Sequence, residues 1–181
     1  MFGLAGKWKK RRSDRLERLA RAIEAVGAHD QHLLDESVRV DQLKGDGAMQ
    51  LYQICREFVD ALNERLSEPA VMLAPFEWER DNFDDGQTNF FQISLRGRLL
   101  QVEFRSTDEM YSTEDFRKPY ILHGTARSFN QESLERNRMG EQRIFCCPAG
   151  KSTEWFFFDA RTYRTGRLNS DYLAAELERL L

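Results

Sequence analysis

The sequence predicts an α+β fold, in which an antiparallel meander sheet of six or seven strands packs against N-terminal helices and one C-terminal helix. Three features support this prediction. Apolar residues recur every three or four positions up to Leu66, alternate with polar residues from Val71 onward, and return to helical spacing after Asn169. The chain has 181 residues, of which 41% are hydrophobic and 12% aromatic, enough for one domain with a substantial core.

The first helix is predicted from a capping pair and an apolar stripe. Asp14 followed by Glu17 resembles an N-terminal capping pair. Helical spacing then relates Leu16, Leu19, Ile23 and Val26, and the helix is expected to end near Gly27. A second, weaker helix is expected between His29 and Lys44, where apolar residues stand among many charges.

A third helix is predicted after "KGDG", Lys44–Gly47, which is expected to break the chain. Asp46 can cap this helix, and Pro69 ends it. Its apolar stripe consists of Leu51, Ile54, Cys55, Phe58, Leu62 and Leu66.

The region of period two begins with three predicted strands. Val71–Glu79 is bent or lies at an edge, because Pro75 cannot donate a hydrogen bond to a neighbouring strand. Asn89–Leu95 and Arg98–Arg105 are predicted to form a hairpin with one apolar and one mixed face. The register that produces those faces pairs Leu95 with Arg98, Ile93 with Leu100, Phe91 with Val102, Gln92 with Gln101 and Phe90 with Glu103.

The aromatic segment near the C-terminus is predicted to be a second hairpin with two apolar faces. Pairing Arg143–Cys147 with Glu154–Phe158 sets Ile144 against Phe157 and Cys146 against Trp155, and it joins Phe145 to Phe156 on the reverse face. Both faces therefore need cover. We expect the helices Ala48–Leu66 and Asp171–Leu181 on one face, and the N-terminal helices or a second subunit on the other. The other predicted elements are strands Tyr120–Arg127 and Thr162–Leu168 and a short helix at Asn130–Met139.

Charge is distributed unevenly along the chain. Residues 1–23 hold eight Lys/Arg against two Asp/Glu, a charge of +6, whereas the whole chain carries −3, so the other 158 residues carry −9. We therefore predict a basic N-terminal helical arm, residues 1–45, followed by an α+β sheet domain, residues 46–181. The predicted binding residues of the arm are suited to nucleic acid or to an anionic membrane surface, and an equally good interpretation is a solvated terminus. They are Lys7, Trp8, Lys9, Lys10, Arg11 and Arg12.

A cytoplasmic location is expected. The chain has no run of about 18 apolar residues, so no integral membrane segment is expected. Its N-terminus does not have the order of charges and apolar residues of a secretory signal. The three cysteines are an odd number with two adjacent, unlike the spaced pairs of a disulfide framework.

The motifs for phosphate and metal binding are incomplete. In "FCCPAGKST" the first glycine position of a phosphate loop is Phe145, and an aromatic strand follows where a helix is required, so the segment is interpreted as a hairpin loop. The acidic segment Glu79–Gln87 lacks the ligand set of a calcium loop. His29 and His32 have no third ligand nearby, and Cys146 and Cys147 point to opposite faces of a strand. No metal and no cofactor are expected.

No complete catalytic set is present, which favours a protein that is not an enzyme. The function we expect first is a non-catalytic interaction module, self-associating or binding a protein partner through its sheet. The alternative is a small hydrolase-type enzyme with a site at His123, Glu103 and Arg105 on the mixed face. A further alternative is that the arm tethers the domain to nucleic acid or to an anionic membrane.

Overall fold

The computed structural model describes residues 3–136 and 139–181, with side chains described from Arg15 onward except for Leu33. Its first element is one long helix. This helix, α1, spans Gly3–Asn63. The chain divides into two compact units, residues 1–41 and residues 42–181. The breaks predicted near Gly27 and at Lys44–Gly47 are therefore wrong, because α1 is continuous through both positions.

The glycines of the predicted break allow close packing and do not end the helix. A Cβ at Gly47 would lie 2.6 Å from Cys146 Sγ, and a Cβ at Gly45 would lie 2.9 Å from Arg80 Nε. At Gly47 the helix backbone thus lies too close to the sheet for a side chain unless the sheet shifts, whereas at Gly45 the near atom belongs to the flexible end of Arg80. A glycine that permits such an approach cannot be distinguished from a helix-ending glycine by sequence pattern alone.

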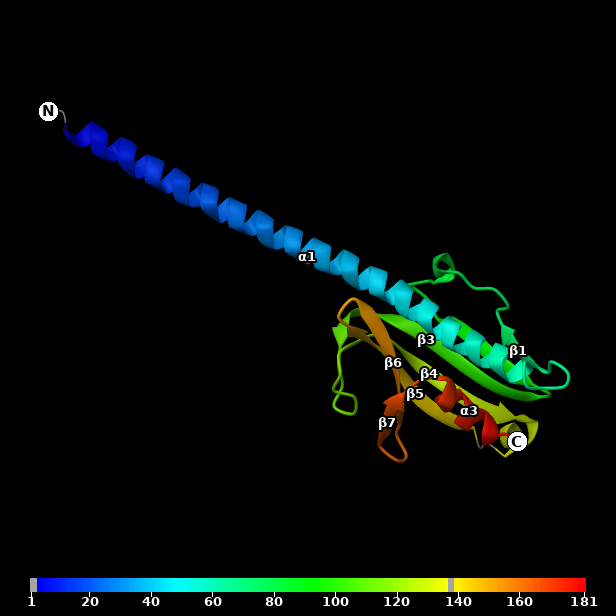
Figure 1. Cartoon of the computed structure of the whole chain (residues 1–181). Coiled ribbons are helices and arrows are strands. Elements are labelled where there is room, and N and C mark those ends of the chain that lie inside the picture. The colour runs from blue at the N-terminus through cyan, green and yellow to red at the C-terminus, as the bar shows by residue number, and fades with distance from the viewer. Residues whose placement is uncertain (1–2, 137–138) are drawn as a thin grey trace. The chain divides into compact units, whose positions relative to one another are not determined.

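The predicted α+β fold is confirmed. Seven antiparallel strands form one sheet in sequence order, from β1 to β7 (Figure 1). Short helical segments lie between strands, at η1 (Arg80–Asn82) and α2 (Gln131–Glu135), and α3 (Ser170–Glu178) follows the last strand. The strands are β1 (Val71–Ala74), β2 (Asn89–Leu95), β3 (Arg98–Tyr111), β4 (Tyr120–Asn130), β5 (Gly140–Ala149), β6 (Ser152–Asp159) and β7 (Arg164–Arg167).

Both predicted hairpin registers are confirmed residue by residue. Leu95 pairs with Arg98 in the first hairpin, and Cys146 pairs with Trp155 in the second. The first turn consists of Arg96 and Gly97, both at positive φ (46° and 81°), as a two-residue turn of type I′ requires. The second hairpin contains the phosphate-loop letters, and β6 begins at Ser152, so a strand follows them and not a helix.

One face of the sheet, here called the helix-covered face, packs against residues 42–63 of α1 and against α3. Trp155 donates a hydrogen bond from Nε1 to the carbonyl oxygen of Gly47 at 2.7 Å. The ring of Tyr172 in α3 stacks on Phe157 with 4.7 Å between centroids. The prediction that these two helices share one face is confirmed, and this face contains the main core of the domain.

The opposite face, here called the outer face, divides into two halves. Over β5 and β6 it carries Phe145 and Phe156, which the segment 112–119 covers with Phe116. The ring of Phe116 stacks on Phe145 with 4.2 Å between centroids and 10° between planes, and Lys118 Nζ lies 3.9 Å above the ring of Phe156. The cover predicted to come from N-terminal helices or a second subunit thus comes from a loop of the same domain. Over β2 to β4 the outer face carries mainly polar and charged side chains.

The acidic segment before β2 is held against α1 by ion pairs. Lys44, which is 5% exposed, lies 3.2 Å from Asp85 through its Nζ. Arg80 lies 3.2 Å from Asp46 and also donates a hydrogen bond to the carbonyl oxygen of Gln42 at 2.8 Å. A buried lysine is costly to leave unpaired, so Asp85 has a structural role in this segment.

Candidate functional site

The structure brings the three residues of the predicted hydrolase-type site together on the outer face. The strand registers place Glu103 beside Thr125 and Arg105 beside His123 in adjacent rows. All four line one cavity of about 290 Å³. The structure thus brings His123, Glu103 and Arg105 together, and what they could do chemically depends on what each side chain contacts.

His123 is held as a neutral imidazole. Arg105 donates a hydrogen bond from Nε to Nε2 of His123 at 3.2 Å, so Nε2 is the acceptor and the ring proton belongs on Nδ1. Partial burial, together with the positive charge of Arg105, lowers the pKa of His123 below its ordinary value. In this arrangement the Nε2 lone pair is engaged, and His123 is a poor proton donor at neutral pH.

Glu103 is bound to an arginine that bridges two carboxylates. Arg127 Nη1 lies 3.1 Å from Glu103, and Arg127 Nε lies 2.8 Å from Glu141. The hydrogen bond to Glu141 is the main cause that raises the pKa of Arg127. Arg143 forms a separate pair with Asp115 at 3.2 Å. The open half of the outer face is therefore a network of paired charges, a pattern that is typical of a solvated sheet face.

The cysteines are buried thiols. Burial raises the pKa of Cys55 to about 12 and that of Cys147 to about 11, and it also raises the pKa of Cys146. These thiols are therefore protonated at neutral pH and poorly suited to act as nucleophiles or metal ligands. Among the side chains that the structure describes, no group of three or more His, Cys, Asp or Glu residues is placed to hold a metal ion.

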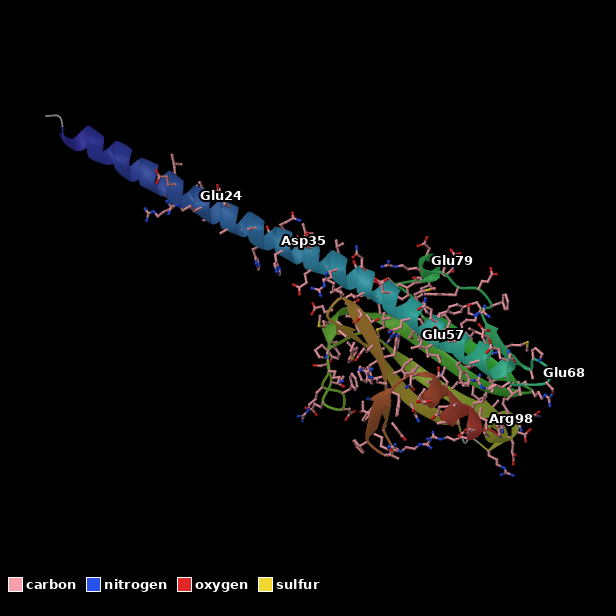
Figure 2. All side chains as sticks on the ribbon, in the orientation of Figure 1. Glu24, Asp35, Glu57, Glu68, Glu79 and Arg98 are labelled. Carbon is pink, nitrogen blue, oxygen red and sulfur yellow. The ribbon has the colours of Figure 1, made fainter. Side chains whose placement is uncertain are left out.

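A row of aliphatic side chains on the first unit is exposed to solvent. We call it the aliphatic stripe, and each of its members is 55–63% exposed. At about 100° per residue the six positions fall within an arc of roughly 120° on one side of the helix. Acidic side chains such as Glu24 and Asp35 project from the same stretch of α1 (Figure 2). The stripe consists of Leu16, Leu19, Ile23, Val26, Leu34 and Val38.

Sequence reasoning found four of the six residues of the aliphatic stripe as one row. The spacing of Leu16 to Val26 predicts this first part, but the assumed helix end at Gly27 separated Leu34 and Val38 from it. The signal that would have joined the two parts is the helical period itself, which resumes in phase at Leu34 and Val38. The residues of the basic cluster predicted to bind anions lie within α1, but their side chains are outside the part that the structure describes. These residues are Lys7, Trp8, Lys9, Lys10, Arg11 and Arg12.

An apolar groove of about 610 Å³ lies at the end of the sheet domain. Sequence reasoning missed this groove, because its lining comes from α1, α3, β1 and the β2–β3 turn, which are far apart along the chain. Its large apolar lining residues are Phe58, Leu62, Leu66, Leu95, Leu177 and Leu181.

Comparisons with known proteins do not assign this chain to a family. No family model, no curated protein and no solved structure gives a significant match. Among the described residues, no helix has the length and apolar character needed to cross a membrane.

Proposed function

We propose that this protein is a non-catalytic interaction module that self-associates through the aliphatic stripe of α1. The observation that supports this most is the exposure of six large aliphatic side chains on one side of a single helix. Isolated exposed apolar residues are ordinary on a protein surface, whereas a contiguous row with helical spacing is typical of a contact surface. A second copy of the chain presents a matching row.

The part of α1 in the first unit would be more stable with a partner helix packed against it. Helices gain most of their stability in proteins from the packing of an apolar face, and nucleation makes unsupported helices marginal in water. The first unit, residues 1–41, contains no element other than α1 among the residues that the structure describes. A second helix packed along the aliphatic stripe would supply the missing contacts.

The area that the stripe can bury is sufficient for a micromolar complex. Full burial of an aliphatic side chain contributes roughly 1.5–3 kcal/mol, so covering a side chain that is about 60% exposed contributes about 1–2 kcal/mol. Six such side chains on each of two copies contribute about 12–24 kcal/mol, compared with about 4–15 kcal/mol for lost freedom on association. A dissociation constant near 1 µM corresponds to about 8 kcal/mol of net binding free energy.

The outer face of the sheet is a weaker candidate surface. Its aromatic half is already covered by Phe116, so the two-sided apolar hairpin does not by itself require a partner. Its open half presents paired charges around Arg127 and His123, which solvent can stabilise. Because these charges are already paired, we favour the interaction module over a hydrolase-type site at His123, Glu103 and Arg105.

Sedimentation equilibrium of the full chain tests the proposal. We expect a dimer at tens of micromolar protein, and we expect Ile23→Asp to be a monomer at the same concentration because it puts a charge into the stripe. Met72→Asp is the matched control, since Met72 is 67% exposed in β1 and outside the stripe. A monomeric wild type, or an Ile23→Asp variant that dimerises like the wild type, would overturn the proposal. Circular dichroism checks that both variants are folded.

A further inference from the structure

We infer that the two α1 helices pair in antiparallel orientation and cross near Gly27. The inference rests on the proposed self-association and specifies how the second copy lies. The midpoint of the aliphatic stripe, from residue 16 to residue 38, is position 27. A two-fold axis there sets Leu16 of one copy beside Val38 of the other, and Leu19 close to Leu34, so the two rows overlap along their full length.

Gly27 lies within the arc of the stripe and at the midpoint of its length. Among the described residues, a Cβ at this position would meet nothing within 4 Å apart from the backbone of its own helix and its neighbours in the chain. Unlike Gly47, then, Gly27 has no close neighbour in the described part of its own chain that explains the missing side chain. Glycine in a helix interior weakens the helix relative to alanine, and a small residue at a helix crossing lets two backbones approach closely. The crossing point of a partner helix accounts for its position.

Asp30 lies in the same arc and favours the antiparallel orientation. In a parallel pair in register, Asp30 of each copy would face Asp30 of the other within an apolar interface, where two carboxylates repel strongly. In an antiparallel pair about Gly27, the two Asp30 residues are separated by six helical positions, or about 9 Å along the axis, and each lies level with Glu24 of the other copy, which is outside the arc of the stripe. A single polar residue at an interface position specifies orientation in this way in other helix pairs.

The charges of the helix agree with this orientation. Residues 13–23 carry three Arg and two Asp/Glu, a charge of +1, and residues 31–41, which lie opposite them in an antiparallel pair about position 27, carry one Arg and three Asp/Glu, a charge of −2. A parallel pair would place each of these segments against the same segment of the other copy. An antiparallel pair places the two segments of opposite charge against each other, and unlike charges across an interface select the partner's orientation.

Disulfide trapping distinguishes the two orientations. The full chain is prepared as Leu19→Cys and as Leu34→Cys, one of them with a tag that changes its mass, and the two are mixed and mildly oxidised. The antiparallel pair predicts a mixed disulfide in about ten-fold excess over either same-residue disulfide, because the bond forms only when the Cα atoms are within about 7 Å. The native cysteines are buried, so the wild type serves as the control for background crosslinking.

The results of this experiment distinguish an error in the helix orientation from an error in the proposed self-association. If both variants sediment as dimers and form mainly 19–19 and 34–34 disulfides, the helices are parallel and this inference is wrong, while the proposed function stands. If the wild type is a monomer, the proposed function is wrong as well. If the cysteine variants dissociate, the salt dependence of the wild-type dimer distinguishes the two orientations. Raising NaCl from about 50 to about 500 mM weakens an antiparallel dimer severalfold by screening attraction, whereas it strengthens a parallel dimer by screening repulsion.

Discussion

Replacing Phe116 by alanine tests whether the chain covers its own outer face. Phe116 is 3% exposed and stacks on Phe145 at 4.2 Å, and it also contacts the rings of Tyr120 and Phe156. Truncating a fully buried phenylalanine removes its transfer free energy and leaves a cavity, and such changes cost about 3–5 kcal/mol. We expect Phe116→Ala to lower the free energy of unfolding by that amount.

Urea denaturation, followed by tryptophan fluorescence, measures the loss, and a dye that binds apolar surface reports the exposed rings. Phe90→Ala is the matched control, because Phe90 lies on the open half of the same face and is 43% exposed. It is expected to cost about 1–2 kcal/mol, in proportion to its smaller burial. If Phe116→Ala changes the free energy of unfolding by less than about 1 kcal/mol and binds no dye, the segment 112–119 is not the cover, and an external partner must supply it.

Two further predictions concern helix packing and the outer face. Gly47→Ala is expected to destabilise the sheet domain by about 1–3 kcal/mol in thermal unfolding, because its Cβ would meet Cys146 Sγ, whereas Gly27→Ala should raise the helicity of the monomer, measured by circular dichroism at high dilution. A neutral Gly47→Ala would contradict the close approach. His123 is expected to titrate below its ordinary pKa of 6.5 in an NMR titration, and Arg105→Gln should raise that pKa. Because the folded-state pKa is lowered, the contribution of His123 to stability is present above pH 6.5 and is lost as pH falls toward the folded-state pKa. An unchanged pKa of His123 in Arg105→Gln would refute the contribution assigned to the charge of Arg105.

The sheet could be predicted from sequence in considerable detail, because its strands pair with near neighbours in the chain. A one-residue slip would move Phe91 and Ile93 to the opposite face, so the apolar pattern selects one register for each hairpin. The cover of Phe145 and Phe156 could not be predicted in the same way. Phe116 is one aromatic residue in a charged loop, and no periodic pattern connects it with the strands it covers.

The helical region was divided at the wrong places because glycine has more than one structural use. Gly27 and Gly47 were both interpreted as breaks, yet α1 passes through both, one open to solvent and one against Cys146. Local rules describe what ends a helix, whereas the contacts that keep this helix continuous at Gly47 come from β5 and β6. Because of that error, Leu34 and Val38 were not joined to the row from Leu16 to Val26. The full aliphatic stripe is apparent only on the continuous helix.

The polar candidate site could be located from sequence, but its chemistry could not. Alternation along the strands assigns side chains to the mixed face, whereas the register that places Arg105 beside His123 is seen only in the structure. Which atom donates to which depends on side-chain geometry that no pattern contains. The hydrogen bond from Arg105 occupies the Nε2 lone pair of His123, which a general base would need free, and no sequence motif contains that contact.

Hydrogen–deuterium exchange as a function of protein concentration tests the central claim most directly. If two copies pair through the aliphatic stripe, the amides of residues 16–38 exchange slowly at high concentration and faster on dilution, while the amides of β3 to β6 are unaffected. Exchange in residues 16–38 that is the same at every concentration would contradict self-association through this helix.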